Sequence, residues 1–177
     1  MTADHLGVPA RAATGTGPRS RVAPLFGVAG AVFLVDVVTK TLAVGLLKPG
    51  HPVALVGDVL TVVLTRNSGA ALSVAAGYTA ALTVIVTGVA VAIVVLGPRL
   101  TTPWQTLGFG LLLGGAGGNL MDRFFRAPGP LRGHVVDFLS VGWLPVFNVA
   151  DAAILGGAAT LAVLALFSPE FGTRPAD

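Results

Sequence analysis

Four long apolar stretches dominate the sequence and leave few choices of fold. They run from about residue 24 to 47, 78 to 97, 104 to 120 and 147 to 167. A helix of about 20 apolar residues crosses the roughly 30 Å hydrocarbon core of a bilayer, and each stretch approaches that length. The sequence therefore predicts an all-α membrane protein with four transmembrane helices, of which the third is the shortest and richest in glycine.

Charged residues are too scarce for an ordinary soluble enzyme. Lys, Arg, Asp and Glu make up 11% of the 177 residues, whereas a soluble domain carries about a quarter. The same composition excludes a disordered chain and a coiled coil. The absence of cysteine excludes disulfides, thiol catalysis and cysteine-ligated metals. The basic residues are scattered and few aromatic residues accompany them, so we expect flanks of membrane spans and no nucleic-acid partner.

The segment between the first two helices, residues 48–76, carries a different pattern. Its apolar part, residues 53–64, is too short to cross a membrane, is rich in Val and Thr, and is interrupted at Gly57. This pattern predicts two short strands around a turn, and hence a small β-rich extracytoplasmic element on the membrane surface. Residues 123–146 contain several prolines and glycines and are predicted to form a loop.

Polar tails bracket the predicted spans. Residues 1–23 are rich in Gly, Pro, Ala and Thr and are predicted to be a disordered cytoplasmic tail. Residues 168–177 form a second polar tail, which leaves 24–167 as a single domain. Basic residues are balanced across the predicted topology, five against five. Only a cluster of three arginines before the first span favours a cytoplasmic N-terminus.

Two charges lie well inside the first span. Asp36 and Lys40 are four residues apart, so they share a helix face and can neutralise each other in part. A charge at the bilayer centre costs about 2.5–3.5 kcal/mol on insertion scales, so both residues need a reason to be there. The sequence leaves two readings open, a structural ion pair and a support for a functional site.

A second polar group ends the third apolar stretch, in the sequence GGAGGNLMDR. Asn119, Asp122 and Arg123 are spaced to line one face at the helix end. The preceding glycines permit close approach of a neighbouring helix. Taken alone, this segment favours a small-residue packing seam with ordinary interfacial charges.

Two aspartates frame the last loop and the fourth span. Asp137 lies in an apolar stretch of the predicted loop, and Asp151 shares a helix face with Asn148. A turn between them can bring both carboxylates together near the membrane surface. Two carboxylates in a low-dielectric site share one proton and can act as general base and general acid. The alternative is that each aspartate only caps a helix.

Other chemistries find little support. The three histidines are far apart in sequence, so no metal site is expected. A nucleophilic pair of Lys40 with Ser68 or Ser73 lacks any motif. The glycines do not form a phosphate-binding loop, because no Lys-Ser or Lys-Thr ending follows them. We therefore expect neither a metal nor an organic cofactor.

In order along the chain, five motifs resemble the lipoprotein signal peptidases, also called signal peptidase II. The resemblance covers about residues 30 to 157. Each motif alone is weak, but the five in this order are specific. They are VDVVTK, RNSGAALS, GGAGGNLMDR, HVVDF and FNVADAAILGG.

The resemblance implies an aspartic endopeptidase of the bacterial plasma membrane, with both termini cytoplasmic and the active site near the outer face. Members of the family remove the signal peptide from prolipoproteins, just before a cysteine that already carries diacylglyceryl. The implied partners are these substrates, membrane lipid and globomycin-type inhibitors. We expect a monomer without a cofactor.

The resemblance also implies roles for individual residues. Asp137 and Asp151 correspond to the catalytic pair, and Asn67 would hold the substrate backbone or an inhibitor. The remaining matched residues would support the site or the substrate; they are Gly69, Asn119, Asp122, Arg123, Asn148, Asp36 and Lys40.

The sequence departs from the family pattern in three places, and one rival function uses the same residues. Leu72 stands where Phe is usual, the interval from Asp137 to Asp151 is short, and residues before Pro24 form an extension. The rival is a proton-coupled transporter or channel in which the intramembrane carboxylates form a relay. A non-catalytic helical scaffold is a further alternative, but it has no use for two aspartates at one depth.

Overall fold

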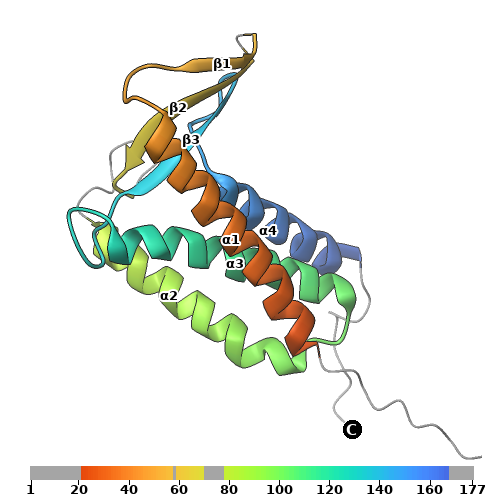
Figure 1. Cartoon of the computed structure of the whole chain (residues 1–177). Coiled ribbons are helices and arrows are strands. Elements are labelled where there is room, and N and C mark those ends of the chain that lie inside the picture. The colour runs from red at the N-terminus through yellow and green to blue at the C-terminus, as the bar shows by residue number, and fades with distance from the viewer. Residues whose placement is uncertain (1–20, 58, 70–77, 168–177) are drawn as a thin grey trace, which may run out of the picture.

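The computed structural model of the chain describes residues 21–57, 59–69 and 78–167. The predicted tails beyond these residues, and the departure at Leu72, lie outside the described part. Within it the chain forms four α-helices (Figure 1). They are α1 (Val22–Leu46), α2 (Thr79–Leu96), α3 (Pro103–Phe125) and α4 (Val149–Phe167). A short 3₁₀ turn, η2 (Gly97–Arg99), follows α2.

The helices confirm a mostly helical membrane fold. By length and composition α1, α2 with its 3₁₀ extension, and α4 are apolar enough to cross a membrane. The third helix has 23 residues, more than the predicted range 104–120, and is continuous to Phe125. Its glycines and its polar last turns lower its hydropathy, so a fourth span remains a prediction.

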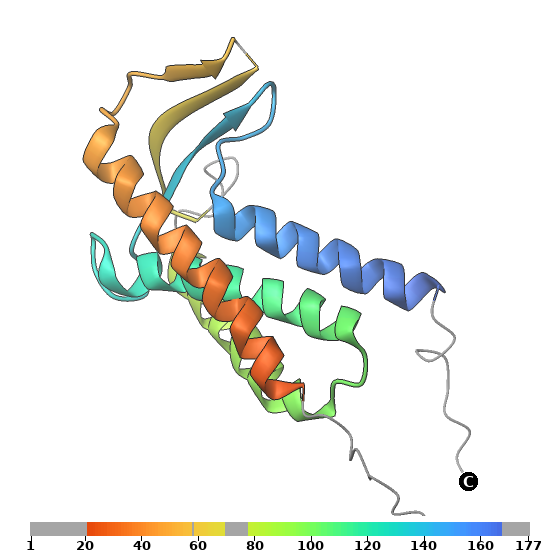
Figure 2. The same cartoon turned by 45° about the vertical axis from the view of Figure 1, so that its right-hand side comes forward.

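The central element of the bundle is α3, which packs against α1, α2 and α4 (Figure 2). Its glycines allow this close packing, as the sequence predicted. A methyl group on Gly114 would lie 2.6 Å from the carbonyl oxygen of Ala29 in α1. On the other side, a methyl group on Gly157 of α4 would lie 2.6 Å from the carbonyl oxygen of Gly108. The backbones of three helices are therefore in near contact at α3.

The outward faces of the helices carry large apolar side chains. These side chains are more than half exposed at positions on α1, α2 and α4, as expected for helices surrounded by lipid. Examples are Leu34, Leu42, Ile85, Val95, Leu155 and Leu166.

A three-stranded antiparallel sheet lies at one end of the bundle (Figure 1). Its order is β1 (Val53–Val56), β2 (Leu60–Asn67) and β3 (Val135–Val141). The first two strands confirm the predicted pair. The prediction of a loop over 123–146 was wrong at β3, because this strand is completed by pairing with β2 far away in the sequence. The third strand also contacts α1 and α3, which joins the sheet to the bundle.

Candidate active site

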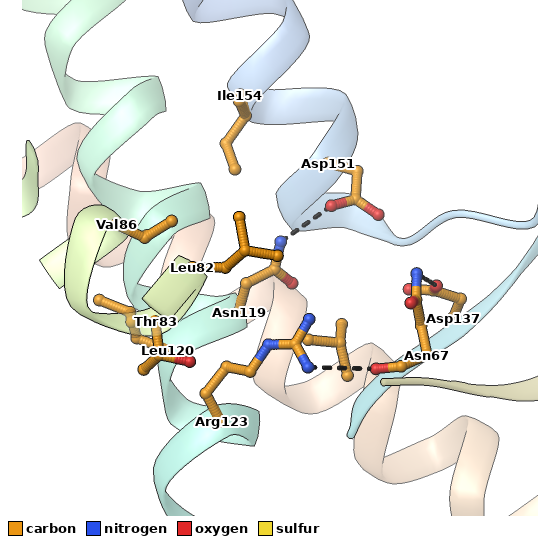
Figure 3. A pocket seen from close by; sticks show the side chains of 11 residues that line it. Asn67, Leu82, Thr83, Val86, Asn119, Leu120, Arg123, Asp137, Asp151 and Ile154 are labelled. Atoms are coloured by element: carbon orange, nitrogen blue, oxygen red, sulfur yellow. Dashed lines mark hydrogen bonds between the residues drawn. The ribbon is translucent and has the colours of Figure 1, made fainter. Parts of the chain in front are cut away.

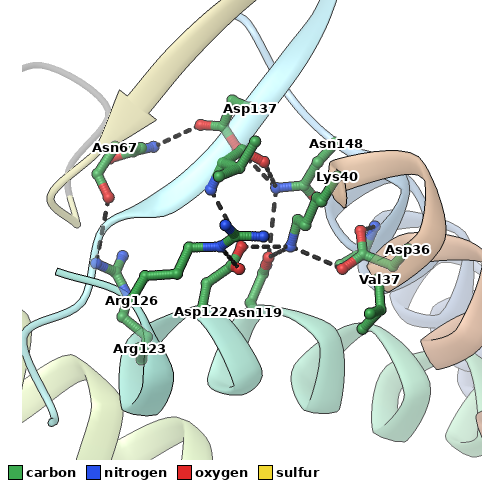
Figure 4. A network of polar contacts seen from close by, with 12 residues as sticks. Asp36, Val37, Lys40, Asn67, Asn119, Asp122, Arg123, Arg126, Asp137 and Asn148 are labelled. Atoms are coloured by element: carbon green, nitrogen blue, oxygen red, sulfur yellow. Dashed lines mark hydrogen bonds and ion pairs between the residues drawn. The ribbon is translucent and has the colours of Figure 1, made fainter. Parts of the chain in front are cut away.

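Asp137 lies in the middle of β3, opposite Thr65 of β2. Its side chain is 2% exposed. Both carboxylate oxygens accept amide hydrogen bonds: Asn67 Nδ2 donates to Oδ2 at 3.0 Å, and Asn148 Nδ2 donates to Oδ1 at 2.6 Å. The strand thus carries a buried carboxylate held by two neutral donors (Figure 4).

Asp151 lies in the first turn of α4, where Asn148 caps the helix. The backbone N–H of Asp151 donates to Asn148 Oδ1 at 2.9 Å, and the N–H of Asn148 donates to Asp151 Oδ2 at 3.3 Å. This reciprocal pair resembles a capping box. The partial positive charge at a helix N-terminus also favours a carboxylate there. Helix capping and the candidate site therefore involve the same residues. Asn148 and Asp151 cap α4 by bonding one another, and Asn148 also binds Asp137.

Asn119 joins Asp151 to the first helix. Its Nδ2 donates to Asp151 Oδ1 at 2.8 Å, and its Oδ1 accepts a hydrogen bond from Lys40 Nζ at 2.9 Å. Figure 3 shows the Asn119 amide directed toward Asp151, with a dashed line for this hydrogen bond. Residues from α1, α3 and α4 are thereby connected through one amide.

Both aspartates line the same cavity, whose volume is about 200 Å³ (Figure 3). Apolar side chains also line this cavity: Leu82 and Val86 come from α2 and Ile154 from α4. The cavity thus places carboxylates beside a hydrophobic wall between two apolar helices.

Burial raises the pKa of Asp137 from 3.8 to about 6. The nearby charge of Asp151 adds to this increase, while the hydrogen bonds from Asn67 and Asn148 oppose it. Burial dominates because a charge is costly to remove from water. Asp137 can therefore hold a proton at mildly acidic pH and release it near neutrality.

A charged cluster fills the side of α3 that faces α1. Lys40 Nζ lies 2.7 Å from Asp36 Oδ2 and 3.1 Å from Asp122 Oδ2. Asp122 also pairs with Arg126 and accepts a hydrogen bond from the backbone N–H of Val136 in β3 at 3.1 Å. Figure 4 shows Lys40 enclosed by these partners. The predicted Asp36–Lys40 pair is present, and it belongs to a larger network.

The predicted single face of Asn119, Asp122 and Arg123 is split by the structure. Asp122 faces the charged cluster, whereas Asn119 and Arg123 line the cavity. Arg123 Nη1 donates to the carbonyl oxygens of Asn67 at 3.3 Å and Gly133 at 2.9 Å. It therefore fixes the end of β2 to the segment that enters β3.

Gly69 supports Asn67 through the backbone. Its N–H donates to Asn67 Oδ1 at 2.9 Å, and its φ of 120° favours glycine. A Cβ there would lie 3.3 Å from Arg123 Nη2. The residue thus orients the asparagine that binds Asp137.

The sequence analysis missed Thr83 and Arg126. Thr83 lies in α2, lines the cavity and is 1% exposed; its hydroxyl donates to the carbonyl oxygen of Leu131 at 2.9 Å. The signal was available, because threonines recur every four residues in an apolar helix at Thr79, Thr83 and Thr87.

Among the described residues, no three His, Cys, Asp or Glu side chains come together as metal ligands.

Comparisons with known proteins show the family to which the chain belongs. Residues 28–167 match the family described as Signal peptidase (SPase) II. The lipoprotein signal peptidase of Mycobacterium avium (strain 104) is 60% identical over 156 residues, which cover 88% of this chain and 86% of the relative. The lipoprotein signal peptidase of Mycobacterium tuberculosis (strain ATCC 25618 / H37Rv) is 60% identical over 163 residues, which cover 90% of this chain and 81% of the relative. The chain spans 66% of the Mycolicibacterium smegmatis relative, also at 60% identity.

Two solved structures share the fold. Both are described as bacterial membrane enzymes, at 2.3 and 1.9 Å resolution. The first superposes with a TM-score of 0.75 at 24% identity and covers 88% of this chain and 94% of its own. The second has a TM-score of 0.72 at 26% identity and covers 82% and 94%. With the matched family and relatives, these findings show that the chain belongs to the signal peptidase II family.

Proposed function

We propose that the chain is an intramembrane aspartic endopeptidase that removes the signal peptide from diacylglyceryl-modified prolipoproteins, cleaving just before the modified cysteine. One observation carries the proposal. Asp137 comes from the strand β3 and Asp151 from the helix α4, and both carboxylates line one cavity. Membership of the signal peptidase II family supports peptide hydrolysis as the chemistry of this pair.

The proposed reaction needs one ionised and one protonated carboxyl group. The ionised carboxylate takes a proton from a water molecule as the water oxygen bonds to the scissile carbonyl carbon. The protonated carboxyl gives its proton to the leaving nitrogen as the C–N bond breaks. The raised pKa of Asp137 supports such a division, since it lets one carboxyl remain protonated beside its partner.

The apolar side of the cavity supports a lipid-bearing substrate. Leu82 and Val86 face Ile154 across the cavity (Figure 3), so a substrate arriving between α2 and α4 would meet hydrocarbon-like surface. Burial of acyl chains gains about 0.8 kcal/mol per CH₂. The proposal therefore places the signal peptide and its lipid in the bilayer, with the scissile bond at the two carboxylates.

The proposal has a definite membrane arrangement. We place all four helices across the bacterial plasma membrane, both termini in the cytoplasm and the sheet with the dyad at the outer face. Residues 24–167 act as one peptidase domain and as a monomer, surrounded by membrane lipid and sensitive to globomycin-type inhibitors. A proton relay is not supported by the comparisons, and α2 contains no Asp, Glu, Lys or Arg from Thr79 to Leu96.

Cleavage by the purified protein tests the proposal. A diacylglyceryl-modified prolipoprotein should be cut before the modified cysteine, and globomycin should block the reaction. Asp137→Asn and Asp151→Asn should each abolish cleavage, whereas Thr160→Val, further along α4, should not. Full activity of either Asp→Asn variant, or cleavage of the unmodified precursor at the same rate, would refute the assignment.

A further inference from the structure

The orientation of the Asn119 side-chain amide determines whether Asp151 accepts a hydrogen bond from it. Asn119 meets Lys40 on its oxygen side and Asp151 on its nitrogen side. An ammonium group has three donors and no acceptor. If the Asn119 amide were turned over, its NH₂ would face the ammonium and its oxygen would face the carboxylate, so both contacts would be repulsive. Lys40, with Asn148 Nδ2 as a second and longer donor at 3.3 Å, thus fixes the orientation in which Asp151 receives an N–H donor.

Lys40 reaches the catalytic pair through this amide. Its side chain is 1% exposed, and its ammonium group has three close acceptors, on Asp36, Asp122 and Asn119. Three acceptors match its three N–H donors. The group therefore has its donors engaged before it could bind either catalytic carboxylate, and Asn119 is its path to Asp151.

The other two asparagines at the site are oriented differently. The side-chain oxygens of Asn67 and Asn148 accept backbone N–H groups, from Gly69 and Asp151 respectively, each at 2.9 Å. Their amides are thus set by local turns of the chain. The side-chain oxygen of Asn119 instead accepts side-chain donors, from Lys40 in α1 at 2.9 Å and from Asn148 Nδ2 at the start of α4 at 3.3 Å.

We propose that Lys40 is a positioning residue for Asp151, which it keeps ready to act as the ionised base by fixing the Asn119 amide. This inference rests on the proposed peptidase function. The water proton passes to Asp151 as the water oxygen bonds to the carbonyl carbon, and the leaving nitrogen takes its proton from Asp137. The deeper burial of Asp137, 2% exposed against a half-buried Asp151, suits this division.

Several charged groups face the catalytic pair and enter its pH dependence. The first helix contributes Lys40 and Asp36, the third contributes Asp122 and Arg123, and the strand contributes Asp137 itself. Arg126 balances the cluster, which holds two positive and two negative side chains. Removing Lys40 alone would upset this balance, so the test needs a compensated background.

The test is a double-mutant cycle in the Asp36→Asn background. Lys40→Met, Asn119→Leu and both together are added to this background, and kcat/KM for a diacylglyceryl-modified prolipoprotein is measured from pH 4 to 9. Each single addition should lower kcat/KM about 10- to 100-fold, the loss of one hydrogen bond to a charged group. Each should also move the acid limb of the profile, which belongs to the catalytic pair as a whole, to higher pH. The variant that carries both Lys40→Met and Asn119→Leu should lose no more kcat/KM than either single addition.

Additive losses, or an acid limb that stays in place while kcat/KM falls at every pH, would overturn the inference. Asn119→Leu in the otherwise unchanged protein provides a second test, because it leaves the Asp36–Lys40–Asp122 pairs intact; an unmoved acid limb there has the same meaning. These results leave the peptidase assignment standing. That assignment fails instead if Asp151→Asn cleaves as well as the unchanged protein.

Discussion

The two sides of α3 treat buried carboxylates in opposite ways. Toward α1, Asp36 and Asp122 face the ammonium of Lys40 and, at one end, a guanidinium. Toward β3 and α4, Asp137 and Asp151 accept hydrogen bonds from asparagine amides and one backbone N–H. The first group is neutralised by cations in contact, and the second is held by neutral donors.

This difference separates a structural role from a chemical one. A cation in contact with a buried carboxylate holds it by charge attraction, and removing one partner of such a pair costs about 3–5 kcal/mol. An amide fixes the position of a carboxylate while leaving it able to gain and lose a proton. The charged cluster is therefore suited to holding α1 on α3, and the amide-bound pair is suited to proton transfer.

The same substitution on the two sides should have the largest and most contrasting effects. Asp151→Asn should lower cleavage by about 10³-fold or more, because a general acid or base is lost, with little change in thermal stability. Asp36→Asn should reduce stability but leave measurable cleavage. Its cost should stay below about 3–5 kcal/mol, because Asp122 still faces the ammonium. Activity assays and thermal unfolding of the two variants in the same detergent measure these effects. Equal losses of activity in Asp151→Asn and Asp36→Asn would contradict the proposed difference between the two sides of α3.

The next effect is a dependence of stability on pH. The pKa of Asp137 is about 6 in the folded protein and 3.8 as its ordinary value, so the folded state holds this proton more strongly. Its contribution is present below pH 4 and is lost as pH rises through 6. Relative to Asp137→Asn, the unchanged protein should lose up to about 3 kcal/mol between these limits, at about 1.36 kcal/mol per pKa unit.

The pH effect is measured by following thermal unfolding of both proteins from pH 4 to 8. A constant offset is expected, because an amide at position 137 has one oxygen for the two donors, Asn67 and Asn148. Only the slope of the difference is diagnostic. Unfolding temperatures that change in parallel would contradict the raised pKa of Asp137.

Two adjacent glycines test how tightly the charged cluster is packed. A Cβ on Gly118 would collide with the Asp36 carboxylate, whereas a Cβ on Gly117 would make an ordinary contact with Phe33, 3.4 Å from its Cδ2. Gly118→Ala should cost about 1–3 kcal/mol through overpacking. Gly117→Ala should be neutral or gain up to about 1 kcal/mol through helix propensity. Similar unfolding temperatures for both variants would argue against close packing at Asp36.

The smallest effects separate the two roles of Asn148. Asn148→Ser keeps an oxygen for the N–H of Asp151 but loses the donor to Asp137 Oδ1. It should keep the stability of α4, since Ser and Asn cap about equally well, and lower kcat/KM about 10-fold. Asn148→Ala should lose about 1 kcal/mol of stability in addition. Equal stability of the Asn148→Ser and Asn148→Ala variants would show that the side-chain cap contributes little to the stability of α4.

The helices were predictable from local sequence, and the third strand was not. Long apolar runs place α1, α2 and α4 within a few residues, because crossing a membrane requires them. The strand Val135–Val141 has its partner in β2, far away in the sequence, and stands between segments rich in Gly and Pro. No local periodicity reports such a pairing, so the sequence alone predicts a loop for this segment.

The site was predictable in its members but not in its connections. Successive helical residues turn by about 100°, so Asp122 and Arg123 diverge to opposite sides of Asn119; the single face predicted for them was too coarse. The meeting of Asp137 with Asn67 depends on the register of β2 against β3. Which donors meet the side-chain oxygens of Asn119 and Asn148 depends on neighbours in three dimensions, and sequence spacing does not contain this information.

The reciprocal hydrogen bonds at the start of α4 bear on how an inactive form of this enzyme should be made. Asp151 faces the cavity and also accepts the N–H of Asn148. An alanine at position 151 would remove the proposed reacting group and also loosen the first turn of α4, so a loss of activity in that variant would have two possible causes. Asparagine retains an acceptor oxygen for that turn. Asp151→Asn is therefore the better variant for capturing an uncleaved precursor in the bound state.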